Sequence, residues 1–128
     1  MSPLGGQHPR HGLDEVIHAP VRFSIVATLS ALDKAEFSFV RDTVEISDSA
    51  LSKQVTVLES AGYLNVKKGY VGKRPRTWLA LSAAGRRAYA THLAALQEIS
   101  HQFEVADQTV STPESAPDDR RLNGRKLR

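Results

Sequence analysis

The feature that most constrains how this sequence can fold is a continuous run of local patterns between residues 37 and 81. At its centre, residues 47–61 place Leu51, Val55 and Leu58 on one stripe of a helix, with polar side chains on the opposite side. A helix of this kind buries one face in a core and leaves the other face to a polar partner or to solvent. The segment is therefore predicted to be a half-buried helix.

Both ends of this predicted helix carry boundary signals. Ser47 or Asp48 can cap the start, because a short side-chain oxygen accepts a hydrogen bond from an otherwise unpaired backbone N–H. Gly62 follows the last turn, and glycine takes the left-handed conformation at this position without strain. The boundaries of the helix are thus predicted from both sides.

A shorter helix is predicted immediately upstream, over residues 38–44, with Phe39, Val40 and Val44 as its apolar positions. Only a tight turn separates it from the longer helix, so the two form a helix-turn-helix.

Two strands are predicted downstream, over residues 63–68 and 77–81, with a segment rich in glycine and proline between them. A hairpin that directly follows a helix-turn-helix is a wing. The expected fold class is mainly α with a small β-hairpin, a winged helix-turn-helix.

The sequence resembles the winged-helix transcriptional regulators of the ArsR and MarR type. The similarity is greatest to a small subgroup with a His-x-Pro-x-Arg pattern in its first helix, here residues 18–22, and a Pro-Arg-Thr-Trp string in the wing, here within residues 69–78. It spans roughly residues 13–103. The resemblance implies a sequence-specific regulator of double-stranded DNA, a homodimeric repressor, with residues 47–61 as the recognition helix in the major groove.

On the recognition helix, five polar positions are expected to face DNA: Asp48, Ser49, Ser52, Lys53 and Thr56. Lys53 can reach a guanine edge or a phosphate, and the hydroxyls can contact phosphates or bases. Asp48 repels phosphate unless it accepts a hydrogen bond from a cytosine amine or only caps the helix.

The charge distribution favours the wing as the site of phosphate contacts. The net charge is only +3, yet no acidic residue occurs between Glu59 and Glu98. The basic part of the wing, residues 67–76, is expected to lie along the DNA backbone or in the flanking minor groove. Its candidate contacts are Lys67, Lys68, Lys73, Arg74 and Arg76. The alternative is a hairpin whose lysines only keep an edge strand soluble.

A final helix is predicted from Ala83 to about Ala106, capped by Ser82. Its apolar residues step by four, three, three and four positions, which makes a near-heptad stripe. A domain of this size has little left to cover the stripe, so it is expected to be the dimer seam. The stripe consists of Tyr89, Leu93, Leu96, Ile99 and Phe103.

The same helix carries His92, Glu98, His101 and Glu104. Some ArsR-type sensors bind zinc between the last helices of a dimer, but only His101 and Glu104 match the spacing of those sites. We therefore expect surface histidines, with no metal and no cofactor, and keep a metal-responsive sensor as an alternative.

Length and composition set the remaining expectations. The 128 residues suffice for one domain, here residues 13–106, flanked by a disordered segment, residues 1–12, and a disordered polar and basic tail, residues 107–128. Cysteine is absent, which excludes disulfides and thiolate sites. No apolar run reaches a membrane span and no signal peptide is evident, so a cytoplasmic location is expected.

Two other functional classes agree less well with the sequence. An enzyme is not expected, because the sequence contains no phosphate-binding loop, serine elbow or zinc-protease motif. A winged helix that binds another protein is the stronger competitor, since fold alone does not determine function.

Overall fold

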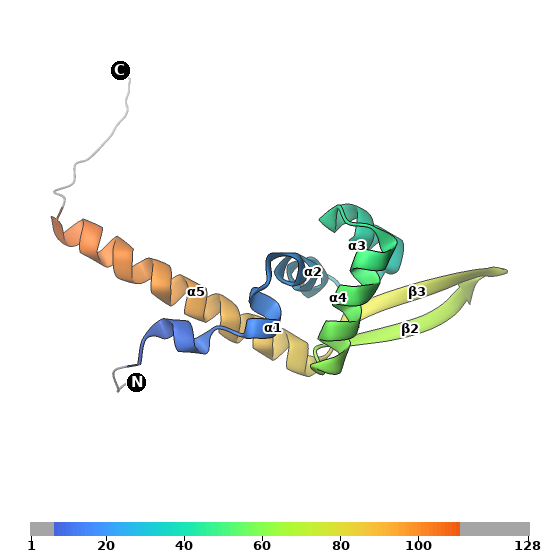
Figure 1. Cartoon of the computed structure of the whole chain (residues 1–128), viewed down its shortest axis with the longest axis horizontal. Coiled ribbons are helices and arrows are strands. Elements are labelled where there is room, and N and C mark those ends of the chain that lie inside the picture. Colours follow the sequence, from blue (N-terminus) through green and yellow to red (C-terminus); the bar gives the residue numbers. More distant parts are fainter. Residues whose placement is uncertain (1–6, 111–128) are drawn as a thin grey trace, which may run out of the picture.

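A computed structural model of the chain describes residues 7–110, with side chains for residues 7–102. A body of short helices carries a three-stranded sheet. The last helix and the hairpin project from the body in opposite directions (Figure 1). In chain order the elements are η1 (Pro9–Gly12), α1 (Glu15–His18), α2 (Pro20–Ser30), β1 (Ala35–Glu36), α3 (Phe37–Val44), α4 (Asp48–Ser60), β2 (Leu64–Val71), β3 (Arg74–Leu81) and α5 (Ala83–Val110). The fold class is the expected one.

The core lies where α1, α2, α3 and α4 meet the base of the hairpin. The predicted stripe of α4 is confirmed, because Leu51, Val55 and Leu58 are all buried there. They pack with Ile25 and Leu79, among others, so the helix-turn-helix and the sheet share one core. Burial of this apolar surface fixes which face of α4 remains exposed.

The ends of α4 form as the sequence predicts. Ser47 is the cap, since its Oγ accepts a hydrogen bond from the backbone N–H of Ala50 at 3.1 Å. Asp48 is instead the first residue inside the helix. At the other end Gly62 has φ of 82°, the left-handed conformation expected after a helix.

The sheet has the strand order β1-β3-β2 and is antiparallel throughout. We define the wing as β2, β3 and their turn, residues 64–81. Its strands run further than predicted, because only Gly72 and Lys73 form the turn, with Gly72 at φ of 64°. Pro75 is compatible with β3 because β1 pairs only with Trp78 and Leu79, which leaves the outer part of β3 without a second neighbour.

In helix α3, the aromatic side chain that packs against the core is not the one named in the prediction. Val40 is buried and Val44 lies against the core, as expected. Phe39, the third apolar position, is instead 51% exposed. Phe37, one residue before the predicted helix, packs against the core instead. The helix begins at Phe37, and tertiary packing rather than helical spacing decides which aromatic is covered.

Helix α5 begins as predicted, since the Ser82 Oγ accepts a hydrogen bond from the N–H of Gly85 at 2.9 Å. It continues to Val110, so the boundary expected at residue 106 was too early. Side chains beyond residue 102, including that of Phe103, and all of residues 111–128 lie outside the described part of the chain.

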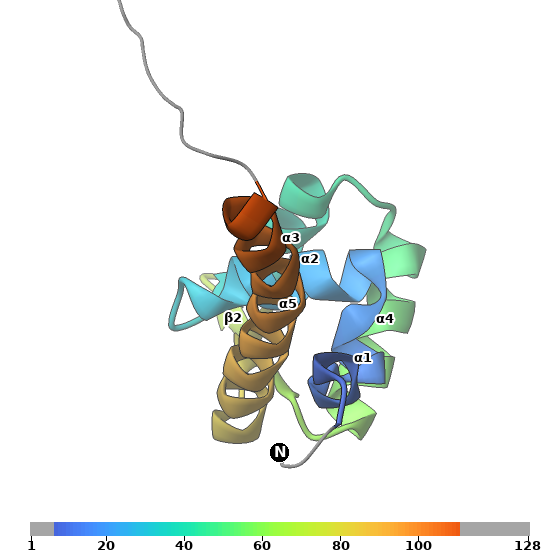
Figure 2. The same cartoon turned by 90° about the vertical axis from the view of Figure 1, so that its left-hand side faces the viewer.

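The N-terminal expectation also needs correction. Pro9–Gly12 form a 3-10 turn that lies against α5 (Figure 2), whereas disorder was expected for residues 1–12. Pro9 presets the backbone angle of the first turn, and the ring Nδ1 of His8 accepts a hydrogen bond from the N–H of Arg10. Contact with the surface of α5 stabilises this turn, which the segment could not form reliably alone. Residues 1–6 are not described.

Within residues 7–110 no helix combines the length and the apolar character that crossing a membrane would require.

Candidate nucleic-acid interface

The predicted recognition positions share the exposed face of α4. Ser49, Ser52, Lys53 and Thr56 are all exposed on the side opposite the buried stripe. The face is built by the same periodicity that buries Leu51, because positions about half a turn away from a buried stripe point outward. The structure thus gathers these four side chains on one surface next to the wing.

A groove of about 680 Å³ separates this face from the wing. From α4, the groove is lined by Asp48, Ser52 and Thr56, among others. From the wing, it is lined by Lys68 and Thr77. Predicted helix and wing residues therefore meet at one concave surface, although Ser49 and Lys53 lie on the helix outside the groove lining.

The pairing register divides the wing cations between two faces. Side chains alternate along a strand, so Lys68 shares with Leu64 and Val66 the face that turns toward α4. Lys67 lies on the opposite face. Arg74 and Arg76 of β3 lie on that face too, because each pairs with a β2 residue that shares the face of Lys67. Lys73 is in the turn. The wing is therefore basic on both faces rather than on one.

Arg76 differs from the other wing cations because it already has a partner. Its Nε lies 3.0 Å from the Oε1 of Glu36 in β1, and the side chain is half-buried. Beside it, the Nζ of Lys34 lies 4.8 Å from the ring centroid of Trp78. Arg76 therefore helps to join β1 to β3, a role that its place in the basic run did not suggest.

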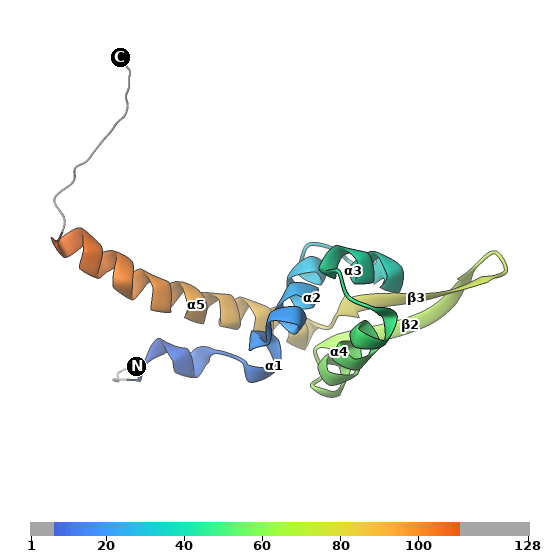
Figure 3. The same cartoon turned by 45° about the horizontal axis from the view of Figure 1, so that its top comes forward.

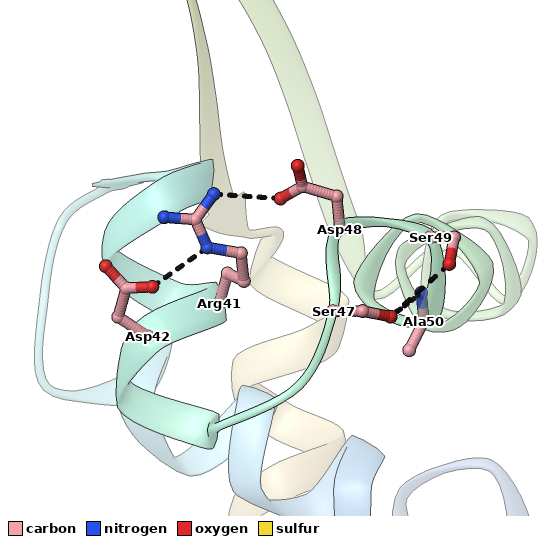
Figure 4. Close-up of polar contacts among 6 residues, drawn as sticks. All are labelled: Arg41, Asp42, Ser47, Asp48, Ser49 and Ala50. Carbon is pink, nitrogen blue, oxygen red and sulfur yellow. Dashed lines mark hydrogen bonds and ion pairs between the residues drawn. The ribbon is translucent and has the colours of Figure 1, made fainter.

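A cation that the sequence analysis did not single out lies at the start of α4. Arg41 of α3 donates from Nη1 to the Oδ1 of Asp48 at 2.9 Å and from Nε to the Oδ1 of Asp42 at 2.8 Å (Figure 4). The Arg41 guanidinium holds the pKa of Asp42 below its usual range, and the two carboxylates raise the pKa of Arg41. The carboxylate of Asp48 is thus paired, which reduces its repulsion of phosphate.

The predicted dimer seam lies along α5. Leu93, Leu96 and Ile99 are half-buried in the single chain. Tyr89 packs inside the chain, with its ring centroid 6.1 Å from that of Phe23. The helix then extends away from the body (Figure 3), so few of the residues that the structure describes are placed to cover the distal part of the stripe.

His92 contradicts the expectation of surface histidines on α5. It is fully buried, and its Nδ1 accepts a hydrogen bond from the N–H of Asp14 at 2.9 Å. Its Nε2 has no hydrogen-bond partner within the described residues, and the rings of His18 and Phe23 lie within 5.5 Å of its own, centroid to centroid. Burial lowers the pKa of His92, with a further contribution from His18.

Asp14 connects His92 to the junction between α4 and the wing. The hydroxyl of Tyr63 donates to the Oδ2 of Asp14, which raises the pKa of Tyr63. Tyr63 follows Gly62 and directly precedes β2. Sequence spacing gave no sign of this network because Asp14 is 49 residues from Tyr63 and 78 residues from His92.

Comparison with known proteins agrees with this geometry. The sequence profile of a family described as winged helix DNA-binding domain matches residues 21–100. An uncharacterized protein of Methanocaldococcus jannaschii is 24% identical over 90 residues, which are 70% of this chain and 98% of that protein.

Two solved structures extend the comparison. A transcriptional regulator homologue from Pyrococcus horikoshii OT3 aligns with a TM-score of 0.67 and 24% identity, over 71% of this chain and 90% of the other. The overoxidized AbfR bound to DNA aligns with a TM-score of 0.59 and 18% identity, over 85% of this chain and 83% of the other. The expected winged-helix fold is confirmed.

Proposed function

Because this chain belongs to the family of winged helix DNA-binding domains, we propose that it is a transcriptional repressor that binds double-stranded DNA as a homodimer. In this proposal α4 enters the major groove and the wing follows the backbone into the flanking minor groove. The protein acts by occupying a DNA site rather than by catalysis.

The observation that carries the proposal is the shared groove between α4 and the wing. Ser52 and Thr56 line it from the helix, and Lys68 lines it from the wing. Hydroxyl groups can contact base edges or phosphates, while lysines neutralise phosphates. One continuous surface therefore offers groups suited to both kinds of contact that a specific DNA-binding protein makes.

The distal part of α5 supports the proposed homodimer. Leu93, Leu96 and Ile99 form a stripe on a helix that leaves the body of the molecule (Figure 1). A second copy of the chain can pack its own stripe against this one, in a self-complementary interface. Two copies then present two α4 helices, and a two-fold DNA site with half-sites about one helical turn apart is expected.

The test begins with the full chain and a library of random duplexes. We expect selection to enrich a two-fold symmetric site, and fluorescence anisotropy to give a linear fall of log K with log salt. A matched duplex of scrambled sequence should bind more weakly, by a factor of roughly a thousand or more. If no duplex binds with a salt-dependent affinity, the proposed function is wrong.

A further inference from the structure

The wing ends in two exposed apolar side chains at the most projecting part of the sheet. Tyr70 is 75% exposed and Val71 is 53% exposed, next to the turn at Gly72 and Lys73. Single exposed apolar residues are common and need no explanation. Here, however, they lie among exposed cations, and no acidic residue occurs in the wing.

The two side chains point to opposite faces, and the register shows which face is which. Tyr70 opposes Pro75, and two residues earlier Lys68 opposes Thr77. Both Lys68 and Thr77 line the groove shared with α4, so Tyr70 extends the same face beyond the groove. Val71 lies on the other face. Of the two, Tyr70 therefore continues the face that borders α4.

We propose that Tyr70 is a DNA-contacting residue, whose ring packs against the sugar edges of the minor groove next to the major groove occupied by α4. This inference rests on the proposed DNA binding and adds a nonelectrostatic contact to it. The cations Lys68 and Lys73 on either side of Tyr70 match a polyanionic partner. The walls of the minor groove offer apolar sugar surface, and other minor-groove proteins insert apolar side chains between base steps from this groove.

The length of the wing is sufficient for this contact. The eight residues of β2 at about 3.4 Å per residue make a strand of roughly 25 Å. Half a helical turn of DNA, which separates the major groove from the next minor groove on one side, is roughly 17 Å. The tip of the wing is only the two-residue turn of Gly72 and Lys73, so no longer loop obstructs its approach to a groove about 6 Å wide.

Three variants of the full chain test the proposal, each measured by anisotropy on the selected duplex over a range of salt concentrations. Tyr70→Ala should weaken binding about tenfold at every salt concentration, since it removes apolar contact but no charge. Tyr70→Phe keeps the ring and should bind within about twofold of the wild type. Val71→Ala, on the opposite face of the same strand, is the matched control and should also bind like the wild type.

The slope of log K against log salt separates this apolar contact from a charge effect. Tyr70→Ala should leave the slope unchanged, whereas Lys68→Ala should reduce it by about 0.9 for each phosphate that is no longer neutralised. Hydroxyl-radical footprinting should show sugars in the flanking minor groove protected by the wild type and by Tyr70→Phe, but not by Tyr70→Ala.

Two results would overturn the inference while leaving the proposed function in place. One is wild-type binding that is salt-dependent and unaffected by Tyr70→Ala. The other is a weaker affinity of Val71→Ala without a weaker affinity of Tyr70→Ala, which would assign the opposite face of the wing to DNA. Absence of binding by the wild type would instead reject the proposed function itself.

Discussion

The exposed face of α4 and the wing lie next to each other but differ in the charge of their side chains. The α4 face carries hydroxyls and one cation, Lys53, with carboxylates at both ends, Asp48 and Glu59. The wing carries four exposed cations and no carboxylate between residues 64 and 81. Of the two surfaces, the wing is the one suited to neutralising several phosphates.

This difference indicates a division of labour within the proposed interface. Phosphate neutralisation supplies affinity for any sequence, while hydrogen bonds to base edges supply selectivity. A hairpin held by backbone hydrogen bonds can carry many like charges, because its fold depends little on its exposed side chains. Helix α4 must instead pack its other face into the core, which restricts it to a narrow exposed surface. Four predictions test this division.

The largest loss of DNA affinity is expected when the proposed dimer is broken, because each protomer then acts without the α4 and the wing of its partner. Leu96→Asp combined with Ile99→Asp places two uncompensated charges in the proposed seam, so the dimer should dissociate. Binding to a two-half-site duplex should then fall roughly a hundredfold or more, because the two copies no longer bind as one unit. Sedimentation and anisotropy measure the two effects. Gln97→Asp, at an exposed position between them, should remain a dimer. A double variant that stays dimeric would place the seam elsewhere.

The wing should control affinity without controlling sequence preference. Replacement of the exposed cations Lys67, Lys68, Lys73 and Arg74 by alanine should weaken binding to all duplexes about tenfold or more and flatten the salt dependence. Arg76→Ala should flatten it less, because Glu36 already pairs with Arg76. Salt titrations on the selected and scrambled duplexes measure both effects. Equal slopes of log K against log salt for the wild type and for the variant with all four substitutions would contradict this division of labour.

The α4 hydroxyls should show the reverse behaviour. Ser52→Ala combined with Thr56→Ala should weaken binding to the selected duplex by about tenfold and leave the scrambled duplex almost unaffected. The salt dependence should not change, since no charge is removed. Ser60→Ala, at an exposed position near the end of the same helix, is the matched control. If both duplexes lost affinity equally, α4 would contribute to binding without selectivity.

The smallest effect concerns the network that connects the two regions. The pKa of buried His92 is lowered in the folded protein. As the pH falls below about 6.5, this side chain therefore becomes protonated in the unfolded state before it does so in the folded state. The contribution of neutral His92 to stability is complete above that pH and decreases toward its lowered pKa. Asp14 and His18 are the titratable groups that face it, and Tyr63 acts through Asp14.

The variant His92→Gln keeps a hydrogen-bond acceptor for Asp14 and does not titrate. Its unfolding free energy, from urea titrations between about pH 5 and pH 7.5, should depend less on pH than that of the wild type. A parallel pH dependence in both proteins would show that His92 does not contribute. Binding assays over the same range would show whether the junction at Tyr63 alters how α4 and the wing act together.

Sequence reasoning was most successful where short-range patterns act alone. The stripe of Leu51, Val55 and Leu58, the cap at Ser47 and the stop at Gly62 each depend on residues within a few positions of one another. The expectation of a surface histidine was wrong at His92, and helical spacing did not show that Phe39 is exposed, because burial at both positions depends on elements distant in the sequence. The DNA contacts of the proposed interface stay predictions.

The sequence by itself determined the order of the helix-turn-helix, the hairpin and the last helix, the exposed polar face of α4 and the acid-free charge of the wing. These properties follow from residue type and from helical or strand periodicity, which are local. The tertiary structure decided that Glu36 pairs with Arg76, that Arg41 pairs with Asp48, and that Asp14 connects His92 to Tyr63. Such pairings depend on where distant segments meet as the core packs, which no local pattern records.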